Sequence, residues 1–137
     1  MWQNFSLKDV NPNVEALPVK TYTWELLPGA KYDEKNRIIC SAGIVGDSEF
    51  AGRRLSFSFP DPEAFSQSGK KQDWSAKMLK RLEVAIGIDS QDTEDPVDYL
   101  NRVAGNRFAA PVKQGKVTEE YPNPRTDLDI FNFKPAA

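Results

Sequence analysis

Apolar and polar residues alternate along three segments in the first half of the chain. Every second side chain is apolar within residues 19–27, 38–44 and 54–59, and the last segment reads Arg-Leu-Ser-Phe-Ser-Phe. Successive side chains of a strand point to opposite faces of a sheet, so this period predicts three β-strands that each bury one face. Residues common in turns, including Pro28-Gly29 and Asp33–Asn36, separate the segments.

The spacing of apolar residues changes from two to three or four after residue 73, which predicts an amphipathic helix. Asp73 is expected to cap the start of this helix by accepting backbone N–H bonds, and Gly87 is expected to end it. Lys77, Lys80 and Arg81 fall on the opposite face or its flank. The apolar face is formed by Trp74, Met78, Leu79, Leu82, Ala85 and Ile86.

A second, shorter helix is predicted to begin at Asp95-Pro96 and to end at Gly105, because Asp is a good N-cap and Pro suits the first helical position. Two further apolar segments, at about residues 107–113 and within residues 126–133, predict the last two strands. In the final segment four side chains are expected to be mostly buried, namely Leu128, Ile130, Phe131 and Phe133.

The predicted order is three strands, an amphipathic helix, a short helix and two strands. This is a mostly β arrangement with helices (α+β), and it matches an OB-fold, a five-stranded barrel with a helix between strands three and four. Other small α+β domains share the order. Residues 1–18 show little periodicity and predict an N-terminal arm, while residues 19–137 predict a single OB-fold-like domain of ordinary size.

Charge is distributed unevenly along the chain. The formal net charge is -2, but residues 50–81 carry seven bases against three acids, and residues 82–101 carry six acids and no base. We therefore expect two separate surfaces, of which the basic one attracts polyanions and the acidic one repels them.

The side chains that usually perform catalysis are scarce. The chain contains no His and a single Cys, Cys40, which excludes His-assisted nucleophilic catalysis and an internal disulfide and makes a zinc site implausible. Neither glycine-rich phosphate-binding motif occurs, and the acids around Asp95 are explained by helix capping rather than by Mg²⁺ binding. We expect a non-enzymatic protein with no cofactor and no metal. The sequence shows no secretion signal and no apolar run of membrane-spanning length.

Cations and aromatic side chains are interleaved along the chain, as single-stranded nucleic acid binding requires. For Trp24, burial in the core is favoured over stacking on a base, because this residue lies in an alternating strand. Tyr32, Phe50 and Tyr121 lie in predicted loops, where stacking on bases and packing are both open. Arg54 must face away from the apolar side of its strand and is a candidate for phosphate contact. The full candidate set is Trp24, Lys31, Tyr32, Arg37, Phe50, Arg53, Arg54, Lys70, Lys71, Tyr121 and Arg125.

Five short segments carry a family resemblance. They are Leu17-Pro18, residues 49–55 (Glu-Phe-Ala-Gly-Arg-Arg-Leu), residues 80–88, residues 105–108 (Gly-Asn-Arg-Phe) and residues 131–136 (Phe-Asn-Phe-Lys-Pro-Ala). In this order the chain resembles bacteriophage-encoded OB-fold single-stranded-DNA-binding proteins of replication and recombination modules. The resemblance covers residues 17–137. The chain departs from the pattern in lacking a glycine after Pro18, and it ends without an acidic tail of the kind that recruits partners in many bacterial single-strand binders.

The resemblance implies largely sequence-independent binding of single-stranded DNA during phage replication or recombination, in the cytoplasm of the infected bacterial host. Its implied partners are single-stranded DNA and phage recombination or replication proteins, with no membrane and with oligomerisation left open. The alternative is a phage protein-interaction module, an inhibitor or adaptor, that acts through the acidic surface between Glu83 and Asp98. Nothing in the sequence favours a third role in virion assembly.

Overall fold

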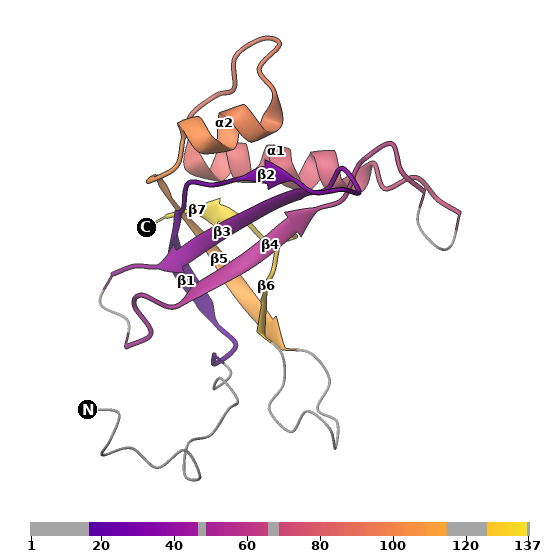
Figure 1. Cartoon of the computed structure of the whole chain (residues 1–137). Helices are drawn as coiled ribbons and strands as arrows, with labels where there is room; N and C mark the ends of the chain where they lie inside the picture. Colours follow the sequence, from indigo (N-terminus) through magenta and orange to yellow (C-terminus); the bar gives the residue numbers. More distant parts are fainter. Residues whose placement is uncertain (1–16, 47–48, 66–68, 115–125, 137) are drawn as a thin grey trace, which may run out of the picture.

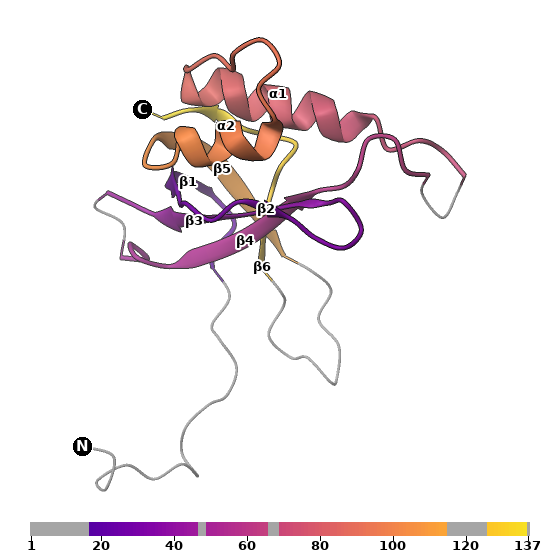
Figure 2. The ribbon, with the colours of Figure 1, turned by 45° about the horizontal axis from the view of Figure 1, so that its top comes forward.

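The computed structural model describes residues 17–46, 49–65, 69–114 and 126–136. Within these ranges the chain is mostly β with two helices, as predicted, and both helices lie together on one side of the sheet (Figures 1 and 2). The elements are, in order, β1 (Thr21–Leu26), β2 (Lys31–Tyr32), β3 (Ile38–Ile44), β4 (Arg54–Phe59), α1 (Trp74–Ile86), α2 (Pro96–Arg102), β5 (Arg107–Gln114), β6 (Thr126–Leu128) and β7 (Lys134–Pro135).

The strands form one antiparallel sheet in the order β2-β3-β1-β5-β6, with β4 on the other edge of β3 and β7 beside β5. β4 pairs with β3 from Ile38↔Phe59 to Gly43↔Arg54. β4 and β6 lie beside each other, but no strand pairing joins them among the described residues. The sheet therefore stays open along this seam, and closure into the predicted five-stranded barrel is not confirmed.

Helix ends follow the predicted capping residues in two of four cases. Gly87 ends α1 in the left-handed conformation, with φ of 82°, which glycine adopts without the steric cost of a Cβ atom. The Asp95 side chain accepts from the backbone N–H groups of Val97 and Asp98 and so caps α2, although α2 ends at Arg102 rather than at Gly105. The capping role predicted for Asp73 is wrong, because its side chain makes no capping hydrogen bond.

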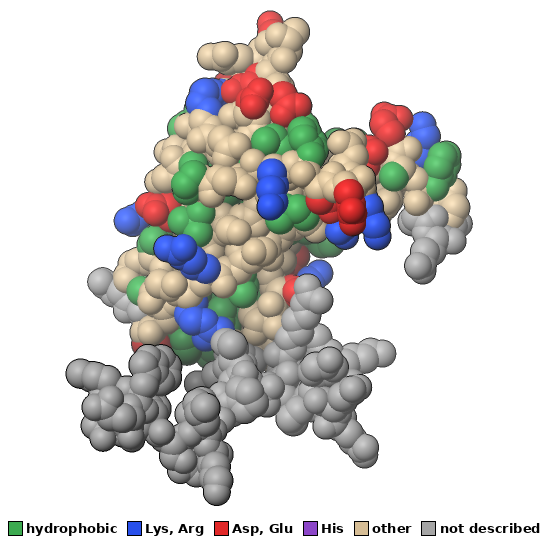
Figure 3. Space-filling model, viewed as in Figure 1, with side chains coloured by type: hydrophobic (Ala, Val, Ile, Leu, Met, Phe, Trp, Pro, Cys, Tyr) green, Lys and Arg blue, Asp and Glu red, His purple; other side chains and the backbone are tan. Residues whose placement is uncertain are grey.

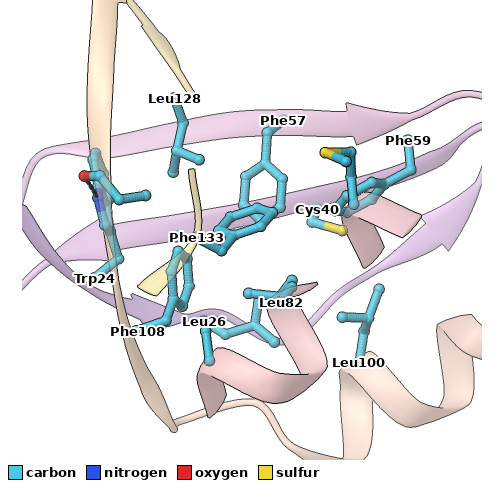
Figure 4. Packing of buried hydrophobic residues seen from close by; sticks show 14 of the residues in the cluster. Trp24, Leu26, Cys40, Phe57, Phe59, Leu82, Leu100, Phe108, Leu128 and Phe133 are labelled. Carbon is cyan, nitrogen blue, oxygen red and sulfur yellow. Dashed lines mark hydrogen bonds between the residues drawn. The ribbon is translucent and has the colours of Figure 1, made fainter. Parts of the chain in front are cut away.

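Side chains from the sheet and from both helices meet in one core (Figure 4). Four phenylalanine rings, of Phe57, Phe59, Phe108 and Phe133, pack with centroid separations between 5.4 and 6.4 Å. Leu82 of α1 and Leu100 of α2 are fully buried against the same cluster. Such burial stabilises the fold by about 1.5–3 kcal/mol for each large apolar side chain.

The start of the domain differs from the prediction. Leu17, which the sequence assigned to the N-terminal arm, is fully buried. Its N–H donates to Thr126 Oγ1 at 3.2 Å, and its carbonyl oxygen accepts from Gln114 at 2.9 Å. The domain therefore includes Leu17, while residues 1–16 of the predicted arm lie outside the described residues. Neither described helix is long and apolar enough to cross a membrane.

Candidate nucleic-acid interface

Trp24 belongs to the core and not to a binding surface. Its side chain is 0% exposed, and its indole Nε1–H donates to the Ala110 carbonyl oxygen at 3.0 Å. A base can stack only on a ring face that solvent reaches. The predicted stacking role of Trp24 is therefore wrong, and the alternative of core packing is confirmed.

Phe50 packs at the rim of the core. Its ring meets the Tyr22 ring edge to face at 6.1 Å, and the Lys20 ammonium group lies 5.9 Å from its centroid and 5.2 Å from that of Tyr22. Arg53, which precedes β4, is half buried, and its backbone bonds to Phe50 and Ile44. Phe50 and Arg53 therefore lie in a packed turn.

Tyr32 lies among carboxylates. Its ring is 41% exposed, but its hydroxyl donates to Asp95 Oδ1 at 2.8 Å. Burial of the hydroxyl, that hydrogen bond and the negative charges of Asp95 and Asp98 raise the pKa of Tyr32 to about 12. The carboxylates repel phosphate groups, so this position is poorly suited to a nucleic acid backbone.

Arg54 lies on the outer face of the sheet, as predicted. It is exposed, whereas Phe57 and Phe59 on the opposite face of β4 are buried. Apart from Ile39, small residues of β3 and β4 occupy the rest of this outer face, and the hydroxyls of Ser41 and Ser56 lie 3.2 Å apart across the two strands. The small side chains allow a ligand backbone to approach the sheet closely.

A groove of about 500 Å³ follows the open seam, and we call it the seam groove. Arg37, next to β3, and Lys113, in β5, stand on its two sides. The described residues that line it are Arg37, Ile39, Ser56, Phe57, Ser58, Lys113, Asp127, Leu128, Ile130 and Phe131. The seam groove is therefore lined by two cations, two hydroxyls and one carboxylate.

Arg37 is held in place by Asp33. The Arg37 Nε–H donates to Asp33 Oδ2 at 2.7 Å, and the Arg37 backbone N–H donates to Asp33 Oδ1 at 2.8 Å. Desolvation acts to raise the pKa of Asp33, but the hydrogen bonds from Arg37 and Lys35 outweigh it and lower that pKa. The carboxylate orients the guanidinium group through Nε and leaves the two terminal nitrogens for a second anion.

Phe131 is a site residue that the sequence did not identify. We expected it to be buried, but its ring is 40% exposed. It stacks on Trp74 with a centroid separation of 5.2 Å and an interplanar angle of 29°, and the Lys113 ammonium group lies 5.3 Å from its centroid. The reason is a turn at Asp129, whose side chain accepts from the Phe131 N–H. That turn interrupts the alternation between β6 and β7.

The remaining candidates are not brought into the seam groove. Lys31 is exposed on β2, and Lys70 and Lys71 are exposed on the loop before α1. Lys71 Nζ lies 3.7 Å from Glu63 Oε2. The last two predicted residues, Tyr121 and Arg125, lie outside the described residues.

Acidic side chains gather around α2 and the loop before it, whereas basic ones lie over the β3–β4 part of the sheet (Figure 3). Part of the acidic surface is neutralised internally. Glu94 accepts two hydrogen bonds of 2.8 Å from Arg102. Those bonds, with one from the Gln91 backbone, lower the pKa of Glu94 to about 2.

Two further features bear on reactive chemistry, the thiol of Cys40 and the grouping of possible metal ligands. Cys40 is buried, and desolvation raises the pKa of its thiol to about 12, so the reactive thiolate is not populated at neutral pH. In the part of the chain that the structure describes, no group of three or more His, Cys, Asp or Glu residues could hold a metal ion.

Neither a family model nor a curated protein matches this sequence.

Proposed function

We propose that this domain binds single-stranded DNA with little sequence preference, on the outer face of β3 and β4 and in the seam groove. The observation that carries the proposal is the meeting of Arg37, Lys113 and the exposed ring of Phe131 at one groove. Single-strand binders combine cations that follow the backbone with aromatic rings on which bases stack. Arg54, at the far end of the outer face, adds a cation along the same strands.

We further infer that the open sheet is a variant of the OB-fold. β1, β3, β4, β5 and β6 follow the five-strand order of that fold, with α1 between the third and fourth strands. OB-folds are partly open barrels that bind oligonucleotides on the face of their second and third strands. These strands correspond to β3 and β4, whose outer face borders the seam groove.

The proposed role is binding without catalysis. The five segments that resemble phage-encoded single-strand binders support an assignment to phage replication or recombination in the infected bacterial host. A protein that covers single-stranded DNA needs neither a reactive side chain nor a cofactor.

Titration of a fluorescent oligo-dT at several salt concentrations tests the proposal. We expect binding that weakens as salt rises, with a shallower salt dependence for the Arg37→Ala/Arg54→Ala variant. Each lost phosphate contact should reduce the slope of log K against log salt by about 0.7. Lys77→Ala is the control, because Lys77 is exposed on α1 and lines neither the seam groove nor the outer face of β3 and β4. No salt-sensitive binding at micromolar protein, or a preference for duplex DNA, would contradict the proposal.

A second candidate function is docking of a protein partner in an apolar groove. A mostly apolar groove of about 260 Å³ lies between the β2–β3 turn, α1 and the start of α2. Among the described residues that line it, Asp61 is the one carboxylate and there is no cation. A pull-down from nuclease-treated host lysate separates the two functions. Docking would be favoured if a stoichiometric partner is recovered with the wild type, is lost with Asp61→Lys, and DNA binding of that variant is unchanged.

A further inference from the structure

A second groove lies on the helix side of Phe131, and we call it the helix-side groove. It has a volume of about 350 Å³ and lies between α1 and the segment that contains β7. The described residues that line it are Lys80, Arg81, Val84, Ala85, Phe131, Asn132, Phe133, Lys134 and Pro135. Among them are three cations and no carboxylate. Lys80 pairs with Glu83 at 3.0 Å, so Arg81 and Lys134 carry the positive charge of this groove, whereas the seam groove also holds Asp127.

Phe131 lines both grooves. Its ring is fixed by stacking on Trp74, at the start of α1. The Arg81 Nη1–H donates to the Phe131 carbonyl oxygen at 3.0 Å, which places a guanidinium group at the junction of the two grooves. That bond uses one of the five N–H donors of arginine. The junction therefore combines an exposed aromatic ring with a cation that has further donors.

The helix-side groove also presents apolar surface. Val84 is 64% exposed on α1, and its neighbour Ala85 lines the groove with it. A nucleobase can cover such surface while its phosphates contact the cations at the rim. The nearby Glu83 should repel phosphates only weakly, because its carboxylate accepts hydrogen bonds from Lys80 and from the N–H and hydroxyl groups of Ser90.

We propose that a bound single strand passes Phe131 and continues in the helix-side groove, where Arg81 and Lys134 contact its phosphates. The inference rests on the proposed function and extends it, since it adds a second stretch of DNA contacts on α1 and β7. Continuity through Phe131, the excess of cations and the exposed Val84 favour nucleic acid as the occupant. Oligonucleotides long enough to fill both grooves should bind more tightly than short ones.

The experiment compares oligo-dT of about 5 and about 15 nucleotides, which lie near the two ends of the roughly 4–16 nucleotides that an OB-fold contacts. We expect Arg81→Ala/Lys134→Ala to weaken binding of the long strand and to reduce its salt slope by about 1.4. Binding of the short strand should be nearly unchanged. Lys77→Ala/Arg107→Ala is a control of matched charge, because both residues are exposed and neither lines either groove. Lys134→Ala alone, which leaves the Arg81 bond intact, should give half of the slope change.

The outcomes separate this inference from the proposed function. If wild type binds both lengths and the double variant behaves as its control, the second groove carries no DNA and the proposed function stands. Equal loss for both lengths overturns the extension, because the helix-side groove would then be the main site. If neither length binds, both proposals fail. Binding of poly-glutamate as tight as that of the long strand would overturn the assignment of the groove to nucleic acid.

Discussion

At the scale of single residues, exposure separates aromatic rings that stabilise the fold from those that can bind a base. Phe131 and Phe133 are two residues apart, yet Phe131 is 40% exposed and Phe133 is 8% exposed. The turn at Asp129 causes the difference, because it removes Phe131 from the alternating pattern. Sequence alternation identified Trp24 as a core residue, but it could not identify Phe131 as exposed without knowledge of this turn.

Alanine substitution should therefore mainly reduce stability at Phe133 and mainly reduce DNA binding at Phe131. Phe133→Ala should lower the free energy of unfolding by about 3–5 kcal/mol, because it leaves a cavity in the core. Phe131→Ala should lower it by about 1 kcal/mol, the order of one aromatic pair, but should weaken oligo-dT binding by about 1–3 kcal/mol through lost stacking. Urea unfolding and DNA titration of both variants check this. An unchanged DNA affinity for Phe131→Ala would remove Phe131 from the interface.

A single residue, Glu94, makes the stability of the folded state depend on pH. Its folded-state pKa of about 2 lies below the ordinary 4.5, because Arg102 and the Gln91 backbone donate to its carboxylate. The ionised carboxylate therefore stabilises the folded state above pH 4.5, and this contribution is lost as the pH falls from 4.5 toward 2. Glu94→Gln should show a smaller drop in Tm over this interval than wild type. Glu63→Gln, at a side chain 82% exposed, is the control, and an equal drop for Glu94→Gln and wild type would exclude this role.

At the scale of elements, the sequence was informative wherever the pattern is local. The ranges of β1, β3, β4 and α1 follow from apolar spacing and from turn residues, because both signals act within a few positions. The two-residue strands β2 and β7 were not predicted, since strands of this length are created by their partners, β3 and β5. Helix caps are predicted only in part, because the sequence identifies a residue type that can cap a helix but not the direction of its side chain.

The two aspartates before the helices test this distinction. Asp95 accepts from the N–H groups of Val97 and Asp98, whereas Asp73 makes no capping bond. Asp95→Ala should lower the free energy of unfolding by about 1 kcal/mol, and Asp73→Ala should change it much less. Denaturant unfolding of both variants measures the difference. A loss at Asp73 equal to that at Asp95 would show that Asp73 caps α1 in solution.

At the scale of the whole molecule, the interface arises from segments far apart in the sequence. The seam groove joins Arg37, next to β3, to Lys113 in β5 and to Phe131 between β6 and β7. No local pattern encodes this meeting, because it depends on the register of β5 with β1 and β6. The sequence identified Arg37 and Arg54 as candidates but not Lys113, Phe131 or the open seam. The net charge of -2 is equally uninformative, since it does not say where charges pair, as Arg37 and Asp33 do, and where a cation such as Lys113 stands at the seam groove.

A ligand that contacts both sides of the open seam should stabilise the whole domain. Binding to the native state alone adds about 2.7 kcal/mol of stability when the free ligand is a hundred times its Kd, so saturating oligo-dT should raise Tm by several degrees. Thermal unfolding with and without the oligonucleotide measures the shift. Duplex DNA at the same phosphate concentration should give a smaller shift, because its paired bases cannot stack on Phe131. Arg37→Ala/Arg54→Ala should reduce the shift produced by the single strand. An equal shift from duplex and single strand would mean that charge alone drives binding, without a role for the exposed ring.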